Sequence, residues 1–411
     1  MPATSRLPVA ALIGTSLFFT GITYASTLNY GAIVGIDTLG IPNALYSMLL
    51  MAASLVGAAA SVILGYISDK VPDRRILVIG CALTGALGFG LIFVLRNQLA
   101  FIAAVCVIMP LGGALFSQSF SFARAYNNIH HRARAEFLTS MLRTVFSVAW
   151  VIVPPVVGWY AAATTVFNAY GVAAVAYLAC AAIFFVLLRN PAAKVGLAAS
   201  TTGQQVPPVK ARIAPAMLGG IIGVTLIFTA IQIRTVTIPL LITSTLRGSF
   251  TDLGIFAGLA AALELPFMVA WGYALRWLSK HTIIICGALL YAAYLVLISR
   301  AGSVAEVLWL QLLNGPATAA LLTIPISYLQ DAIRGRVGLS TSLLDVTHVV
   351  AAIVSATLFG VLTGSVQNYP QLMVVAAGLS AAGAAILFAA HRLFRAAPLP
   401  LATGSTPRAP S

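Results

Sequence analysis

The amino-acid sequence predicts an all-α polytopic membrane protein with twelve transmembrane helices in two pseudo-symmetric six-helix bundles. The composition, the lengths of the apolar segments and an internal repeat each support this fold class. Of the 411 residues, 60% are hydrophobic and 8% are charged, whereas a soluble domain has roughly 45–50% apolar and about 25% charged residues. Such a chain cannot cover its surface with polar groups, so an ordinary soluble enzyme is excluded and the lipid bilayer is the expected partner.

Apolar segments long enough to cross a bilayer, about 20 residues each, are spread along the whole chain. The first six lie near 8–30, 43–66, 75–95, 99–123, 137–161 and 166–188. The second six lie near 214–243, 250–275, 282–299, 304–329, 338–363 and 370–391. We therefore expect an N-terminal bundle at 1–188, a polar linker at 189–213, a C-terminal bundle at 214–395 and a disordered tail at 396–411.

The basic residues predict the orientation of the chain in the membrane. If the N-terminus is cytoplasmic, eighteen of the 23 Lys and Arg residues lie in cytoplasmic segments, and only Arg96, Arg247 and Arg300 lie in outside loops. Cytoplasmic loops are typically enriched in Lys and Arg. Both termini, the linker and the tail are therefore expected in the cytoplasm. The net charge of +14 is attributed to this topology, and no nucleic-acid partner is expected.

Landmarks repeat between the two sets of spans. Gly65 at the end of the second span matches Gly272 at the end of the eighth, at an offset of 207 residues. Pro110 in the fourth span matches Pro316 in the tenth, at an offset of 206 residues. Equivalent landmarks at equivalent spans indicate a duplicated six-helix unit, as in many transporters.

The loop after the second span contains a Gly, then an Asp with a basic residue, then a second Asp with a basic pair. These residues are Gly65, Asp69, Lys70, Asp73, Arg74 and Arg75. The pattern resembles the signature loop of the major facilitator superfamily, which implies the fold of that superfamily. In such a loop Gly permits close helix approach, an Asp caps a helix N-terminus, and the basic residues pair with it and hold the cytoplasmic side.

Further stretches resemble one family within that superfamily, the bacterial sugar efflux transporters. The spacing Asp-x-x-x-Asp-Arg-Arg, the segment Ser147–Pro155 and the segment Leu263–Pro266 carry the resemblance. It implies a proton-driven exporter of sugars or glycoside-like molecules in the bacterial inner membrane, monomeric and without a cofactor. The chain departs from the family in the seventh span, where Arg234 and Thr235 stand in a region expected to carry an acidic residue before Pro239.

Five ionisable side chains within or near the predicted spans are assigned to proton coupling or gating: Arg143, Arg234, Glu264, Asp345 and His348. An ionised group at membrane depth costs roughly 2.5–3.5 kcal/mol on insertion scales unless it is paired or wetted. Arg143 and Glu264 lie at similar depths, about 10–12 Å from the cytoplasmic ends of the fifth and eighth spans. These spans are neighbours in the superfamily, so an ion pair is expected, acting as a gate latch, in proton coupling or in substrate contact. Glu264 is also the second candidate for a proton carrier.

Asp345 is the first candidate for the proton carrier. It matches Arg143 of the first half at an offset of 202 residues, so the equivalent site carries the opposite charge. The second span offers Gly57 and no cation at the facing position, which leaves Arg234 or His348 as its partner. A carboxyl without a partner in a low-dielectric site takes up a proton readily. The alternative is an ordinary carboxylate at a wet cavity wall.

Sugar binding needs side chains that match hydroxyl groups and an aromatic platform for the ring. The candidates are Asn29, Tyr30, Gln118, Trp150, Gln232, Gln311 and Asn314. Most of the amides fall in spans one, four, seven and ten, which line the cavity in the superfamily. For each single amide, a hydrogen bond between helices is the alternative.

A multidrug efflux antiporter is the alternative function, and a mostly aromatic and apolar cavity would favour it. The segment Pro155–Gly158 partly resembles a helix bend of proton/drug antiporters, although a structural kink explains it equally well. The four cysteines lie in apolar segments without metal-ligand or CxxC spacing, so neither a metal site nor a disulfide framework is expected. The motifs HExxH, GxSxG and the Walker loop do not occur, so no catalytic residues are assigned.

Overall fold

The computed structural model describes residues 9–68, 70–195, 215–332, 337–364 and 368–395, and these are almost entirely helical. The first half contains α1 (Val9–Ala25), η1 (Ile33–Thr38), α2 (Asn43–Ser68), α3 (Arg74–Leu95), α4 (Gln98–Ala103), η2 (Ala104–Ile108), α5 (Met109–Gly112), α6 (Leu115–His130), η3 (Arg132–Arg134), α7 (Ala135–Ala163), α8 (Phe167–Leu188) and η4 (Pro191–Ala193). The second half contains α9 (Pro215–Leu240), η6 (Leu241–Thr245), α10 (Phe250–Ala274), α11 (Lys280–Ser299), α12 (Val304–Trp309), α13 (Gln311–Ala332), α14 (Val337–Thr363) and α15 (Tyr369–Arg395). Most of the predicted linker and the whole predicted tail lie outside the described residues.

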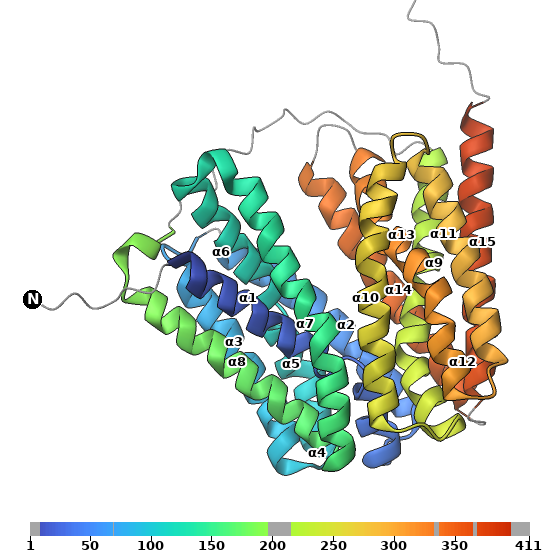
Figure 1. The fold of residues 1–411 in the computed structure, drawn as a ribbon, viewed down its shortest axis with the longest axis horizontal. Helices are drawn as coiled ribbons and strands as arrows, with labels where there is room; N and C mark the ends of the chain where they lie inside the picture. Colours follow the sequence, from blue (N-terminus) through green and yellow to red (C-terminus); the bar gives the residue numbers. More distant parts are fainter. Residues whose placement is uncertain (1–8, 69, 196–214, 333–336, 365–367, 396–411) are drawn as a thin grey trace, which may run out of the picture.

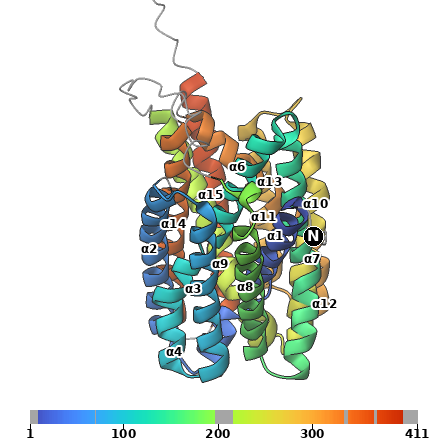
Figure 2. The same cartoon turned by 90° about the vertical axis from the view of Figure 1, so that its left-hand side faces the viewer.

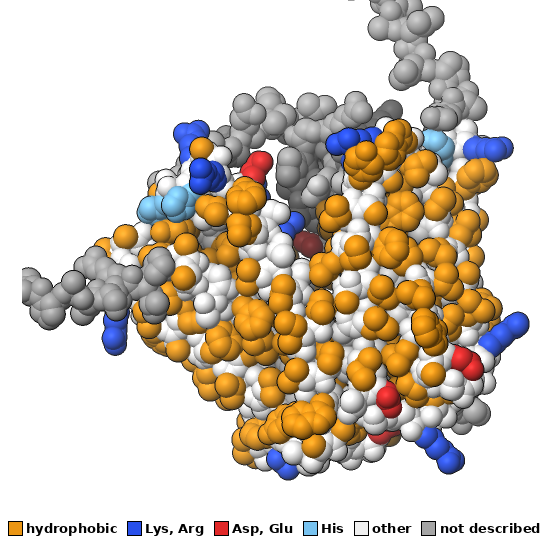
Figure 3. Space-filling model, in the orientation of Figure 1, with side chains coloured by type: hydrophobic (Ala, Val, Ile, Leu, Met, Phe, Trp, Pro, Cys, Tyr) orange, Lys and Arg blue, Asp and Glu red, His pale blue; other side chains and the backbone are white. Residues whose placement is uncertain are grey.

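Eleven of the helical segments are long and apolar enough to cross a membrane. The shorter apolar helix α1 continues through a turn into the π-helical segment η1, which ends at Thr38, and so supplies a twelfth span. Figure 3 shows a surface covered mostly by hydrophobic side chains, with the charged groups gathered toward its upper and lower ends. The prediction of a multi-pass, all-α membrane protein with twelve spans is confirmed.

Helices α1–α8 gather on one side of the molecule and α9–α15 on the other (Figure 1). Within the first group α3 packs against α8, and within the second α9 packs against α15. Across the divide, α7 packs against α10, and α2 packs against α14, which lies behind it in Figure 2. These two helix pairs form much of the contact between the halves.

Glycines allow α7 and α10 to approach very closely near the loops that follow α7 and precede α10. A Cβ atom added at Gly158 would lie 2.5 Å from the carbonyl oxygen of Phe250 and 2.9 Å from the Cα of Gly254. Because these are backbone atoms, they cannot rotate away from a larger side chain. Gly158 therefore forms a tight helix crossing in this structure, and the interpretation of this segment as a helix kink stays a prediction.

Two hydrogen bonds join the halves at the same end of the molecule, which we call the closed end. Asn43 Nδ2 at the start of α2 donates to the carbonyl oxygen of Thr363 at the end of α14, at 3.1 Å. Ser244 Oγ in η6 donates to Asp37 Oδ2 in η1, at 2.7 Å. Asp37 and Ser244 are themselves related by the repeat offset of 207 residues, so they meet across the pseudo-symmetry axis.

At the opposite end, which we call the open end, the halves diverge (Figure 1). A Cβ added at Gly65 or Gly272 would meet no atom within 4 Å. The expectation that Gly65 permits close helix approach is therefore wrong for this structure, because open space surrounds it. The residues before and after the predicted linker, at the ends of α8 and the start of α9, also belong to this end (Figure 1).

Candidate functional site

A cavity of about 400 Å³ lies between the two halves. Its lining comes from the turn after α1 and from α7, α9, α10 and α13, namely Leu28, Asn29, Phe146, Ser147, Trp150, Ile231, Arg234, Thr235, Phe256, Ala257, Ala260, Ala261, Glu264, Leu265, Met268, Thr318 and Leu322. This volume falls within the roughly 300–1,000 Å³ that small-molecule sites occupy. Most of the lining is apolar, with a small number of polar side chains that converge on the same space.

The first half supplies an aromatic wall and one amide to this cavity. Trp150 and Phe146 lie one helical turn apart on α7, with ring centroids 6.3 Å from each other, and Asn29 lies in the turn after α1. Trp150 and Phe146 also line a second cavity of about 560 Å³, bounded by α1, α2, α5, α6 and α7. The two hollows therefore adjoin at the aromatic pair, which can provide a platform for a ring-shaped ligand.

The second half supplies the charges. Thr318 Oγ1 on α13 donates to Glu264 Oε1 on α10, at 2.8 Å. The guanidinium of Arg234 on α9 lies over the rings of Phe256 and Tyr294, 5.2 and 5.9 Å from their centroids. Its Nε and Nη2 are buried and have no hydrogen-bond partner in the described part of the chain. The guanidinium of Arg234, the carboxylate of Glu264 and the hydroxyl of Thr318 thus lie on the wall that the second half contributes to the cavity.

The expected ion pair between Arg143 and Glu264 is not formed in this structure. Arg143 is exposed on α7, and among the described residues no ion pair of 4 Å or less joins it to Glu264. The physical reason is the divergence of α7 and α10, which touch at Gly158 near the closed end and are separated by the cavity at the level of Glu264. The similar depths of Arg143 and Glu264 along their spans do not bring them together, because the distance between α7 and α10 at that depth decides whether the side chains can meet. Arg234 is the cation that shares the cavity with Glu264.

Asp345 and His348 line a different cavity, of about 510 Å³, between α2 and α14. Both side chains are exposed to this space, and the ring of His348 stacks on Phe228 with centroids 4.3 Å apart. The side chain of Asp345 is exposed where α14 faces this cavity, and its role as the proton carrier stays a prediction. The alternative of a carboxylate at a cavity wall describes it. Gly57 also lines the second cavity, so the three hollows adjoin.

Several predicted binding residues do not reach the cavity between the halves. Tyr30 is 1% exposed and packs edge-on against Phe250 near the closed end. Gln311 and Asn314 are fully buried, with Asn314 Nδ2 donating to Gln311 Oε1 at 2.9 Å and Gln311 Nε2 donating to the hydroxyl of Tyr294 at 3.3 Å. These amides serve the alternative role, hydrogen bonds within the bundle.

Two other amides also lie away from the lining. Gln118 is buried in α6 and Gln232 is half-buried in α9. Of the predicted binding set, Asn29 and Trp150 do line the cavity. Phe146 and Thr318 line the cavity but were not among the predicted binding residues. The spacing of four residues between Phe146 and Trp150 could have indicated that both lie on the same helix face.

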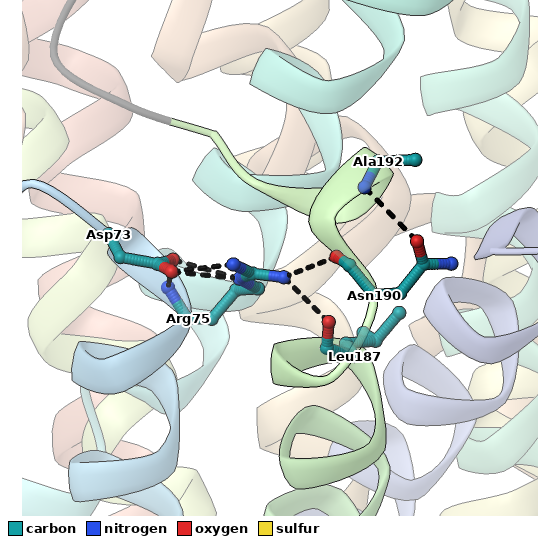
Figure 4. Close-up of polar contacts among 5 residues, drawn as sticks. All are labelled: Asp73, Arg75, Leu187, Asn190 and Ala192. Carbon is teal, nitrogen blue, oxygen red and sulfur yellow. Dashed lines mark hydrogen bonds and ion pairs between the residues drawn. The ribbon is translucent and has the colours of Figure 1, made fainter.

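The loop between α2 and α3 is an anchor within the first half. Asp73 caps α3 by accepting a hydrogen bond from the backbone N–H of Arg75, at 3.1 Å, and its Oδ2 lies 2.6 Å from Nη2 of Arg75. Nη1 of Arg75 donates to the carbonyl oxygens of Leu187 and Asn190 at the end of α8, at 2.6 and 2.9 Å (Figure 4). The prediction that an Asp in this loop caps a helix and pairs with a basic residue is confirmed for Asp73 and Arg75.

Electrostatics strengthen this anchor. Burial alone would raise the pKa of Asp73, but the hydrogen bonds and the positive charge of Arg75 lower that pKa below its ordinary value. A cation at the carboxyl end of α8 also compensates the partial negative charge there. Arg74 donates to Ser121 Oγ at 2.9 Å, and Lys70 donates to the hydroxyl of Tyr66. Asp69 lies outside the described residues.

In the described ranges, no three His, Cys, Asp or Glu side chains lie close enough together to hold a metal ion.

A family model described as Major Facilitator Superfamily matches residues 10–299. Sugar efflux transporter A of Dickeya chrysanthemi is 29% identical over 374 residues, covering 90% of this chain and 92% of that protein. Sugar efflux transporter C of Escherichia coli is 27% identical, covering 88% of this chain and 91% of that protein.

Solved structures agree in fold. The nucleoside transporter NupG is similar with a TM-score of 0.75 and 12% identity, over 94% of this chain and 100% of that one. The POT family transporter PepTSo is similar with a TM-score of 0.77 and 9% identity, over 96% of this chain and 99% of that one. The prediction of a transporter rather than an enzyme is confirmed by the family match and the curated relatives. The family model covers well over half of the residues, and the chain therefore belongs to the major facilitator superfamily.

Proposed function

We propose that this transporter exports sugars or glycoside-like molecules in exchange for protons. The cavity between the halves is the observation that carries the proposal, because Trp150 offers a platform for a sugar ring and Asn29, Thr318 and Glu264 offer hydroxyl-matching groups around it. The relatives named sugar efflux transporters support the same substrate class. Two bundles, 1–188 and 214–395, rock about this site on the linker 189–213, and the protein acts as a monomer.

The open end faces the cytoplasm of a bacterial cell in this proposal, and the membrane is the inner membrane. Lys70, Arg74 and Arg75 lie at the open end, whereas Arg247 and Arg300 lie in the loops of the closed end. Cytoplasmic loops are the basic ones. Both termini are then cytoplasmic, and the structure corresponds to the state in which an exporter loads its substrate.

Glu264 and Asp345 are the proposed proton carriers, and the structure favours Glu264 as the first of them. Glu264 is half-buried in the cavity beside Arg234, whereas Asp345 is exposed. An ionised Glu264 accepts hydrogen bonds from the hydroxyls of a sugar, and a proton that arrives from outside removes this acceptor and releases the substrate. Arg234 cannot take this role, because a guanidinium does not release its proton at physiological pH.

Purified protein in liposomes with an imposed pH gradient tests the proposal. Glu264→Gln should abolish uphill transport of a labelled methyl glucoside. It should keep exchange between equal concentrations well above the half-saturating value, because exchange needs no net proton movement and a high concentration compensates the weaker binding to a neutral side chain. Asp345→Asn is measured in parallel, and Glu136→Gln, at the exposed first turn of α7, is the matched control that should behave like the unaltered protein. Uphill transport that survives in both carboxyl variants contradicts proton coupling through these groups.

Multidrug efflux is the second candidate function, and the apolar character of the lining favours it. Leu28, Ile231, Leu265, Met268 and Leu322 face the same space as the aromatic rings. Apolar surface of this kind suits amphipathic cations as well as the apolar face of a glycoside. Transport of a cationic dye by the same liposomes, without transport of any sugar, would decide for this alternative.

A further inference from the structure

The cavity contains a cation whose hydrogen-bond donors are not all used. We propose that Arg234 binds the carboxylate of an acidic sugar, so that monoanionic sugar acids, such as hexuronates, are preferred over neutral sugars. This assignment rests on the proposed function, since it names the substrate class of the same cavity. Nothing in it depends on which carboxyl carries the proton.

The unpaired atoms of Arg234 have the geometry that a carboxylate requires. Nε and Nη2 are the two buried nitrogens of this side chain that have no hydrogen-bond partner among the described residues, and together they form one edge of the planar guanidinium. Two parallel N–H groups on such an edge match the two oxygens of a carboxylate. A guanidinium stays charged, so leaving these donors unpaired at membrane depth is unfavourable. A ligand with two acceptor oxygens relieves this cost.

The surroundings of Arg234 fit a sugar that carries this acid group. The guanidinium is held over Phe256 and Tyr294, which fixes its position and leaves Nε and Nη2 without a hydrogen-bond partner in the described part of the chain. Trp150 and Asn29 lie on the wall that the first half contributes to the same cavity. A sugar ring placed against Trp150 can therefore direct its carboxylate toward Arg234 and its hydroxyls toward Asn29.

The charges of the lining limit the ligand to one negative charge. Among the residues that line the cavity, only Arg234 and Glu264 are ionisable, and their charges cancel. A carboxylate adds a single negative charge, which Arg234 can meet with two hydrogen bonds. A phosphate ester would bring up to two negative charges close to Glu264 with one cation to balance them. The geometry and the charges together point to a carboxylate.

The experiment compares four labelled sugars that share one ring: glucose, glucuronate, glucose 6-phosphate and glucosamine. Exchange into liposomes that contain the full-length protein, without a pH gradient, gives the half-saturating concentration for each sugar. Unaltered protein should half-saturate with glucuronate at a concentration at least about tenfold lower than with glucose, as expected for hydrogen bonds between charged groups. Arg234→Gln should erase this preference and leave the value for glucose within about threefold. Arg300→Gln, the same change at the exposed end of α11, should keep the preference.

Each other outcome overturns the assignment in a recognisable way. If glucose is transported as well as glucuronate by the unaltered protein, the carboxylate site is wrong but sugar transport stands. If glucose 6-phosphate or glucosamine is preferred, the charge assignment is wrong. If folded Arg234→Gln loses all four sugars equally, Arg234 pairs with Glu264 in another state instead of binding substrate. If no sugar moves at all, the proposed function itself fails. The comparison within the unaltered protein stays decisive even when the variant does not fold.

Discussion

The two ends of the molecule are held together in different ways. At the open end, an ion pair and hydrogen bonds lie inside one half, where the buried Arg75 joins Asp73 and the end of α8. At the closed end, the contact lies between the halves and consists of backbone packing at Gly158 and Gly254 with a few hydrogen bonds. Among the described residues, the ion pair therefore lies within one bundle, whereas the contacts described between the bundles can separate without breaking an ion pair.

The largest expected effect comes from breaking the anchor at the open end. Arg75→Ala leaves Asp73 and two carbonyl oxygens without their partner, and removing one member of a buried pair costs about 3–5 kcal/mol. Arg276→Ala is the matched change just after α10, in the equivalent loop of the second half, where the exposed guanidinium lies over the ring of Tyr273, 4.5 Å from its centroid. It should cost no more than about 1 kcal/mol, as for an exposed cation over an aromatic ring. Thermal unfolding of the purified proteins in detergent measures both.

An equal loss of stability in these two variants would contradict the comparison, because the anchor would then be no stronger than its counterpart in the second half. Transport by Arg75→Ala, measured below its unfolding temperature, should remain. The anchor acts within one half, so its loss does not by itself open or close the path between the halves.

A smaller loss of stability is expected at the closed end, where a substitution adds atoms between the halves instead of removing a contact within one half. Gly158→Leu forces a side chain against the backbone of Phe250 and Gly254, and overpacking of this kind costs about 1–3 kcal/mol. The molecule can relieve the strain by opening at this end. In a chain whose four native cysteines are replaced by Ala, Ser47→Cys reports the opening, because Ser47 is 6% exposed and packs against Gly360 of the other half.

An impermeant thiol reagent added from outside should label this cysteine roughly 5–160 times faster after Gly158→Leu, which is the same free energy expressed as a ratio. Gly272→Leu is the control, since a Cβ there meets no atom within 4 Å. Slow labelling in both variants would show that the tight crossing does not hold the closed end shut. Fast labelling of the Ser47→Cys chain that keeps Gly158 would contradict the assignment of closed and open ends.

Sequence patterns predicted the spans because apolar length is a local property, and the helix α2 at Asn43–Ser68 closely follows the predicted 43–66. They also predicted the cap at Asp73, which depends on a few neighbouring residues. Sequence patterns did not predict which side chains face the cavity, because that depends on the rotation of each helix about its axis. Gln311 lies in a bundle although its span borders the cavity, while Thr318 on the same helix reaches Glu264. Neither the rotation nor the tilt of a helix could be predicted from a uniformly apolar span.

The smallest expected effect is the response of the anchor to acid. The pKa of Asp73 is lower in the folded protein than its ordinary value of 3.8, so its ionised form is stabilised by folding. Such a group contributes its full stability above the unfolded pKa, and the contribution is lost as the pH falls through the folded pKa. Asp73→Asn should therefore lower the unfolding free energy by about 1.5 kcal/mol at pH 7, as for a hydrogen bond to a charged group. The difference from the unaltered protein should stay constant down to about pH 4 and shrink below it.

In an Arg75→Ala background the same substitution should have almost no effect, because the partner that lowers the pKa is gone. A difference that grows on acidification, or that persists without Arg75, would mean that Asp73 acts only as a helix cap and that the charged anchor is not what holds the open end of the first half.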